Sequence, residues 1–112
     1  MSGKIAKIAL VALVFAAAAF PAHAQQAASV SITVKNHRFQ PAEIHAPAKV
    51  PIELHIKNLD PAPMEFESVS LRVEKVVTGN GEGIIRLRPL APGRYNFFDD
   101  FHQETTGVLV VR

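Results

Sequence analysis

The chain has 112 residues and a formal net charge of +2 at pH 7, and two lysines near its start, Lys4 and Lys7, account for that excess. The remainder carries as many acidic as basic residues, which argues against nucleic acid as a partner. Cysteine is absent, so the sequence excludes a disulfide scaffold and any thiolate metal ligand. Core packing alone must hold such a domain together.

The start of the chain has the three-part layout of a secretory signal peptide. Two lysines form a basic start, residues 8–20 are apolar, and Ala22-His23-Ala24 supplies a small-residue cleavage site before Gln25. The apolar stretch is shorter than the roughly 20 residues of a membrane span; a retained anchor is the alternative. We therefore predict a signal peptide over residues 1–24, a single domain over 25–112 and a periplasmic location.

The remaining chain alternates between hydrophobic and polar residues in short segments, as half-buried strands do. Turn residues separate these segments, and no helical periodicity of useful length occurs, so we predict an all-β sandwich. The segments expected to be extended are 30–35, 52–57, parts of 64–77, 84–87, 95–98 and 108–111. The predicted core consists of Val34, Ile44, Ile52, Leu54, Ile56, Phe66, Leu71, Val73, Ile85, Leu87, Tyr95, Phe97, Leu109 and Val111.

Two segments resemble the cupredoxins, and the likeness covers nearly all of the chain after the signal peptide. Residues 90–98, Leu-Ala-Pro-Gly-Arg-Tyr-Asn-Phe-Phe, are similar to the Pro-Gly-x-Tyr-x-Phe segment that enters the metal-binding loop of this family. His102 and Gly107 continue that loop. Residues 39–44 and 51–58 resemble the second and third strands. The resemblance implies a Greek-key β-sandwich with a metal site at its loop-bearing tip.

The sequence departs from the blue-copper members of that family at three of the four ligand positions. In those members the late loop supplies a cysteine, a histidine and usually a methionine, and an earlier histidine follows a proline. Counting on from Tyr95, Asp99 stands at the cysteine position and His102 falls on the histidine. No methionine follows His102, and Met64 stands after Pro63 where the earlier histidine would be.

These departures resemble a particular group of cupredoxin-like proteins. Residues 63–68, 74–77 and 98–102 are similar to the EfeO-type group, which accompanies bacterial iron-uptake permeases. The resemblance implies periplasmic handling of ferrous iron, as a copper-assisted or direct ferrous oxidase. It also implies two partners, a periplasmic iron-binding protein and an inner-membrane iron permease. The bound metal is left open as copper, iron or both.

The candidate metal ligands come from these same segments. Side chains alternate along a strand, so Asp99 should share the core face of Phe97 and point into the tip. Met64 should face the opposite way from Glu65, so all these ligands converge only if the strand bulges. Carboxylate and imidazole suit Cu(II) and iron, whereas a thioether favours Cu(I). The predicted ligands are Met64, Glu65, Asp99 and His102, with Glu67, Asp100 and Glu104 as a secondary set.

Three functional hypotheses follow. In the first, iron held by Asp99, Glu65 and His102 is more easily oxidised from ferrous to ferric, because carboxylates stabilise the higher charge. In the second, the protein binds or delivers copper without a redox role, mainly through Met64 and His102. In the third, the sandwich binds no metal: Met64 fills the core, Asp99 caps a turn, and the other candidates are solvated, as we expect for His37, His45 and His55.

Overall fold

The computed structural model describes residues 26–112, so the predicted signal peptide lies outside the described residues. All regular elements within 26–112 are strands, and none of this part is a helix long and apolar enough to cross a membrane. The strands are β1 (Ala28–Lys35), β2 (Arg38–Gln40), β3 (Glu43–Ala46), β4 (Ile52–Asn58), β5 (Met64–Ser68), β6 (Val73–Val77), β7 (Glu82–Leu87), β8 (Gly93–Asp99) and β9 (His102–Val111).

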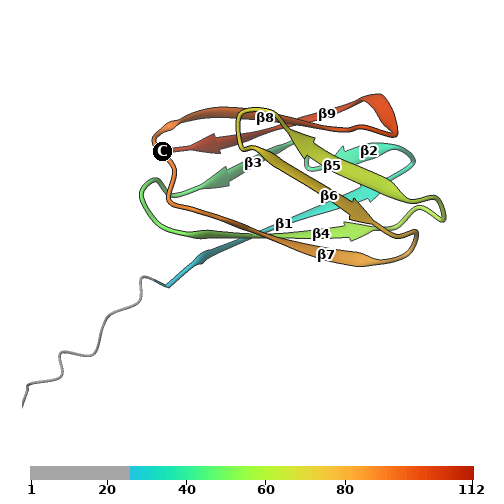
Figure 1. Cartoon of the computed structure of the whole chain (residues 1–112), viewed down its shortest axis with the longest axis horizontal. Helices are drawn as coiled ribbons and strands as arrows, with labels where there is room; N and C mark the ends of the chain where they lie inside the picture. The colour runs from blue at the N-terminus through green and yellow to red at the C-terminus, as the bar shows by residue number, and fades with distance from the viewer. Residues whose placement is uncertain (1–25) are drawn as a thin grey trace, which may run out of the picture.

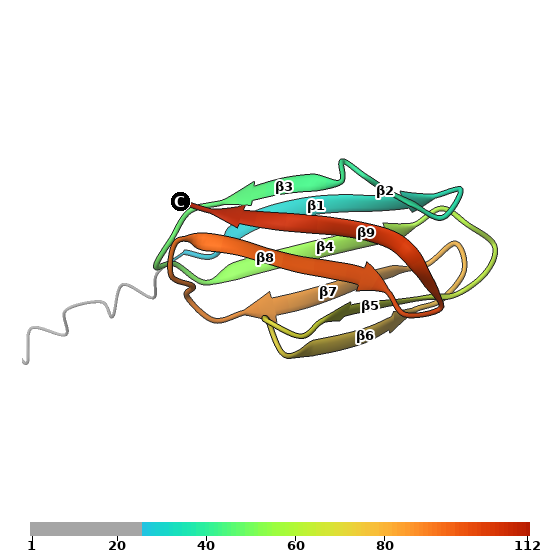
Figure 2. The same cartoon turned by 90° about the horizontal axis from the view of Figure 1, so that it is seen from above.

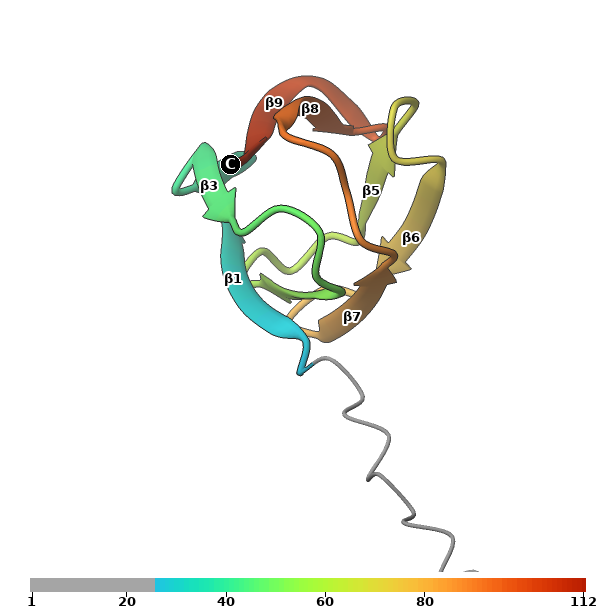
Figure 3. The ribbon, with the colours of Figure 1, turned by 90° about the vertical axis from the view of Figure 1, so that its left-hand side faces the viewer.

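The strands form two sheets that pack face to face around one core, as the view along the long axis shows (Figure 3). One sheet has the order β2-β1-β4-β7, and the other has the order β3-β9-β8-β5-β6. The pairs β1–β4 and β3–β9 are parallel, and the other pairs are antiparallel. The chain passes from the first sheet to the second between β2 and β3 (Figure 2). The prediction of an all-β Greek-key sandwich is confirmed.

The core lies between the two sheets and matches the predicted set closely. All predicted members are buried except Val73 and Tyr95, which are partly buried and pack against the core. Three aromatic rings occupy it: the Phe97 centroid lies 4.9 Å from that of Phe39 and 4.8 Å from that of Phe66. Such pairs each stabilise the fold by about 1 kcal/mol beyond the area they bury.

One expectation about the strands is wrong. We expected a metal-binding loop after residue 98, but a two-residue turn, Asp100-Phe101, leads directly into β9, whose cross-strand pairing with β8 extends down to Asp99 and His102. Parts of the segment 64–77 are extended, as predicted, and a turn over 69–72 separates β5 from β6. Tight antiparallel pairing within one sheet therefore replaces the loop that the resemblance implied.

Four turns gather at the end of the sandwich that lies away from the C-terminus (Figure 1). They connect β1 to β2, β4 to β5, β6 to β7 and β8 to β9. We call this the distal end. Because strands of both sheets finish there, residues far apart in the sequence come together at this end.

Candidate metal site

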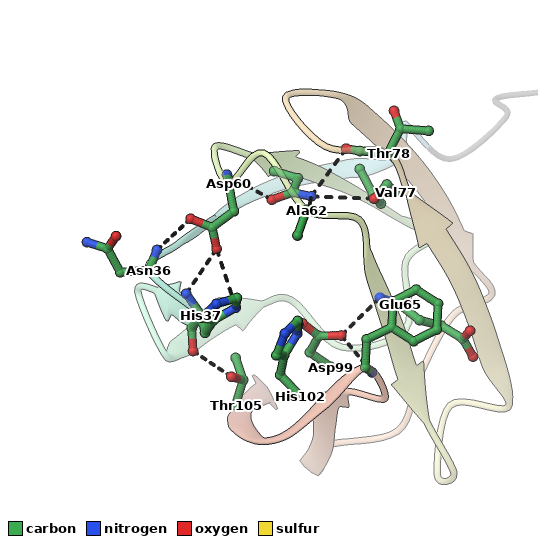
Figure 4. Close-up of polar contacts among 12 residues, drawn as sticks. Asn36, His37, Asp60, Ala62, Glu65, Val77, Thr78, Asp99, His102 and Thr105 are labelled. Atoms are coloured by element: carbon green, nitrogen blue, oxygen red, sulfur yellow. Dashed lines mark hydrogen bonds and ion pairs between the residues drawn. The ribbon is translucent and has the colours of Figure 1, made fainter.

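Asp99 is fully buried at the distal end, at the last position of β8. Its Oδ1 accepts hydrogen bonds from the backbone N–H groups of Glu65 and Phe101, each at 3.0 Å. Its Oδ2 lies 3.1 Å from Nδ1 of His102 (Figure 4). A buried carboxylate needs such donors to replace its lost hydration. Asp99 therefore connects β5, the Asp100-Phe101 turn and β9, and both its carboxylate oxygens already have a hydrogen-bond partner.

His102 owes its position to an irregularity in the pairing of β8 with β9. The register shifts after Phe98, which pairs with Thr106, so that Asp99 pairs with His102. Such shifts re-aim side chains near functional sites. A carboxylate only accepts hydrogen bonds, so Nδ1 of His102 carries the proton that points at Asp99. In the neutral imidazole with its proton on Nδ1, the lone pair is on Nε2, and the side chain is 29% exposed.

The residues present do not fit a blue-copper centre. That centre depends on a short bond between copper and a thiolate, and the chain has no cysteine. Asp99 stands at the corresponding position, but its oxygens already accept three hydrogen bonds. The Met64 side chain lies in the hydrophobic core at 2% exposed. A metal at this end of the sandwich therefore needs ligands other than those of a blue-copper centre.

A second group of candidates lies on the outer face of β5. Glu65, Glu67 and Asp100 each offer a carboxylate oxygen, and these oxygens lie within 4.8 Å of one another. We call these three residues the acidic cluster. The N–H of Asp100 donates to the carbonyl of Glu65 at 2.9 Å, which holds the turn against β5. Glu74 of β6 adds a fourth negative charge, because it stands opposite Glu67 in the strand pairing.

Crowding raises the proton affinity of this cluster. Partial burial, followed by the negative charge of Asp100 and by Glu74, raises the pKa of Glu67 to about 6. Partial burial and the charge of Asp100 also raise the pKa of Glu65. Both effects disfavour the charged form of a carboxyl group. A cation placed among the three carboxylates would relieve the same repulsion.

The structure thus divides the predicted ligands into separate groups. Met64 and Asp99 face the interior, whereas Glu65 points away from Asp99 and the histidines (Figure 4) and joins Glu67 and Asp100. The hypothesised set of Asp99, Glu65 and His102 is not brought together. Alternation along β5 is the reason, since no bulge interrupts that strand between positions 64 and 68.

Glu104, the remaining member of the secondary set, is exposed on β9. It lines a surface hollow with His37 and Thr106, and it is not a member of the acidic cluster.

His37 is a residue that sequence reasoning missed at this end. Its imidazole ring lies 4.0 Å from that of His102, measured between centroids (Figure 4). Its side chain is 49% exposed, as expected of a turn residue, but the neighbouring histidine was not foreseen. Asn and His are enriched at positive φ, so the sequence Asn36-His37 indicates a tight turn at this point. The structure confirms the turn, with φ of 52° at Asn36 and 56° at His37.

Comparison with known proteins agrees with this architecture. The chain matches the cupredoxin-like domain family over residues 7–111, and it belongs to that family. It is 43% identical over 83 residues to an uncharacterized protein of Rickettsia prowazekii, and the match covers 73% of this chain and 66% of the relative. The chain thus spans slightly less than two thirds of that relative's length.

Solved structures with the same fold are more distant in sequence. The metal-binding domain of the Cu(I)-exporting ATPase CopA of Streptococcus pneumoniae superimposes with a TM-score of 0.68 at 20% identity, covering 75% of this chain and 84% of that one. Amicyanin from Paracoccus versutus gives 0.60 at 14% identity, with 78% and 84% covered. A purple cupredoxin from Nitrosopumilus maritimus gives 0.56 at 16% identity, with 76% and 99% covered. These likenesses show the cupredoxin-like fold.

Proposed function

We propose that this is a periplasmic iron-handling protein of the EfeO type that binds ferrous iron at the acidic cluster. The single observation that carries the proposal is the convergence of Glu65, Glu67 and Asp100, whose carboxylate oxygens lie within 4.8 Å of one another. Oxygen ligands of this kind suit hard cations and iron. The partners of such a protein are a periplasmic iron-binding protein and an inner-membrane iron permease.

The negative charge of the acidic cluster favours ferric over ferrous iron. Three carboxylates stabilise a trivalent ion more than a divalent one, because the Coulomb attraction grows with the charge of the ion. Ferrous iron held there loses one electron to dissolved dioxygen more readily than ferrous iron in water. The ferric product remains bound until a partner removes it. The protein would in this way assist oxidation before transport.

A second candidate is a copper-binding protein or chaperone with no redox role. One observation favours it: the Nδ1 side of His102 is held by Asp99 at 3.1 Å, which leaves Nε2 for a metal. A related fold, the CopA domain, was solved with Cu(I). Iron binding at the acidic cluster separates the two candidates, because the copper candidate does not need it.

The test is anaerobic titration with Fe(II), with Mn(II) as a probe that does not oxidise under these conditions. We expect Glu67→Gln and Asp100→Asn each to weaken binding of both ions about tenfold or more, since each removes a charged ligand. Glu104→Gln is the matched control and should bind like the wild type, because this exposed glutamate lies outside the cluster. Admission of oxygen should then convert bound iron to ferric faster than iron in buffer.

Two results would contradict the proposal. Equal Fe(II) affinity in the wild type and Glu67→Gln would remove the cluster as the iron site. An unchanged ferrous lifetime after admission of oxygen would remove the oxidative role and leave only binding.

A further inference from the structure

Basic and acidic turns lie at opposite ends of the sandwich. The turns at the end opposite the distal end, which we call the proximal end, cover residues 47–51, 69–72 and 88–92. The charged side chains of these turns are all cations, Lys49, Arg72 and Arg88. Apart from histidine, the charged side chains of the distal turns are both carboxylates, Asp60 and Asp100. An anion is therefore attracted to the proximal end.

Three arginines line one hollow at the proximal end. Arg72 comes from the turn between β5 and β6, Arg86 from β7, and Arg88 from the turn after β7. The hollow has a volume of about 270 Å³, which limits a ligand to a small molecule. We propose that this hollow binds a small, multiply charged oxyanion through the guanidinium groups of the three arginines.

The alternation of β7 places two of these arginines together. Leu87 is buried in the core, whereas Arg86 and Arg88 on either side of it are exposed. Residues two positions apart along a strand share a face and are separated by about 7 Å. β7 is also an edge strand, which pairs only with β4. Both side chains can therefore reach one anion between them.

Arg72 reaches the same hollow from the other sheet. β6 and β7, which are edge strands of the two sheets, lie side by side (Figure 3). In the turn before β6, the hydroxyl of Ser68 accepts from the N–H of Leu71 at 3.2 Å and donates to the carbonyl of Asn96 at 2.7 Å. The N–H of Arg72 donates to the carbonyl of Val69 at 3.2 Å. These bonds hold Arg72 at a φ of 55°, a conformation that is unfavourable for most residues.

The positive charges around this hollow are largely uncompensated. Within residues 26–112, no carboxylate oxygen lies within 4.0 Å of the Arg72 or Arg88 guanidinium. Nε of Arg86 lies 4.0 Å from Oε2 of Glu53, whose other oxygen already lies 2.9 Å from Nε2 of His55. Three like charges around one hollow repel each other, and an anion among them would relieve that repulsion.

The guanidinium groups determine the class of ligand. Each presents a planar fork of N–H donors that matches two oxygens of a carboxylate or phosphate group. Chloride, a single atom, offers no such match. The apolar floor of the hollow consists of the buried side chains of Leu71, Leu87 and Leu90. Charge interactions are stronger beside such a low-dielectric surface than in open water.

A structural role is the alternative explanation for these cations. Basic residues on an exposed edge strand discourage pairing with another sheet. That role accounts for Arg86 on β7, but it does not account for Arg72 and Arg88, which lie in turns. Glu74 lines an adjacent hollow with Arg72, but the two side chains form no ion pair in the described part of the chain.

The experiment is titration with inorganic phosphate and, separately, with citrate at neutral pH and low ionic strength, followed by NMR of the arginine Nε–H groups. We expect saturable shifts of the three arginines that line the hollow. Arg72→Asn and Arg88→Gln should each weaken binding about fivefold or more. Arg88→Lys should weaken it less than Arg88→Gln, because lysine keeps the charge but loses the fork. Asparagine is chosen at position 72 because it tolerates positive φ.

Arg38→Gln is the matched control, because Arg38 is an exposed arginine of β2 that lines a different hollow. It removes the same charge and should bind both anions like the wild type. Circular dichroism confirms that each variant is folded. Tighter binding of phosphate would assign a phosphate group to the ligand, and tighter binding of citrate would assign carboxylate groups.

Further controls separate this site from the proposed iron site. Glu67→Gln should bind phosphate like the wild type, and Arg88→Gln should bind Fe(II) like the wild type. Three results would overturn the oxyanion site, whatever the result for iron. These are the absence of saturable shifts with both anions, equal affinity in the wild type and Arg88→Gln, and shifts that sodium chloride reproduces at the same ionic strength.

Discussion

Asp99 shows how one residue can change the chemistry of a site while the fold is kept. It stands where the resemblance places a cysteine, and it is fully buried. Its oxygens bind two backbone N–H groups and the Nδ1 of His102. A carboxylate in this position therefore acts as an anchor for β5 and β9, and it orients the imidazole of His102.

We expect Asp99→Ala to lower the free energy of unfolding by about 3 kcal/mol, because it leaves the partly buried N–H groups of Glu65 and Phe101 without their acceptor and opens a cavity at a fully buried position. Asp99→Asn should lose much less, since an amide oxygen can accept the same two bonds. Urea denaturation of both variants measures the difference. An alanine variant as stable as the wild type would show that Asp99 is not a structural anchor.

At the scale of elements, the hairpin of β5 and β6 places like charges opposite each other. Glu67 pairs with Glu74 across the hairpin, an arrangement that destabilises a sheet. The pKa of Glu67 rises to about 6 as a result of partial burial, of Asp100 and of this neighbour. A pairing that costs stability at neutral pH is consistent with the proposed role of this face in binding a cation.

The sign of the pH dependence follows from that shift. Between pH 4.5 and about 6 the folded protein holds a proton on Glu67 that the unfolded chain releases, so stability falls as pH rises through this window. Glu67→Gln removes the effect and should raise the melting temperature at about pH 7.5, with a smaller change at about pH 4.5. Glu104→Gln should change neither value. A larger gain at the lower pH would contradict the assignment.

At the scale of the whole molecule, the metal-binding candidates lie at the end of the sandwich opposite the ends of the described chain (Figure 1). The distal end carries the acidic cluster, His37 and His102, whereas the described chain begins and ends at the opposite end (Figure 1). Ala28, where β1 begins, therefore lies at the end of the sandwich opposite the metal-binding candidates. Removal of the predicted signal peptide should leave the distal end unchanged.

We expect export of the full chain in a Gram-negative host to yield a protein that begins at Gln25, because Ala22-His23-Ala24 has the small residues that signal peptidase needs. Intact-mass measurement of the periplasmic fraction tests this. A chain retained in the membrane with Met1 or the apolar stretch still attached would instead support a membrane anchor.

Local patterns in the sequence were sufficient for most of the strands, for the core and for the face of each residue in β5 and β8, but not for the start of β9 at His102. Alternation has a period of two, so Phe97 facing the core requires Asp99 to face it as well, and Met64 facing inward requires Glu65 to face outward. The same rule foresaw that the predicted ligands could not all converge without a bulge.

Only the tertiary structure decided which turns meet. His37 lies in a turn of one sheet and His102 begins a strand of the other, and their contact depends on the order of the strands, on the register shift between β8 and β9 and on Asp60, which holds the first turn. None of these leaves a periodic trace in the sequence, because alternation specifies the face of a side chain but not its neighbour across the sandwich. The acidic cluster likewise depends on pairing between β5, β6 and β8.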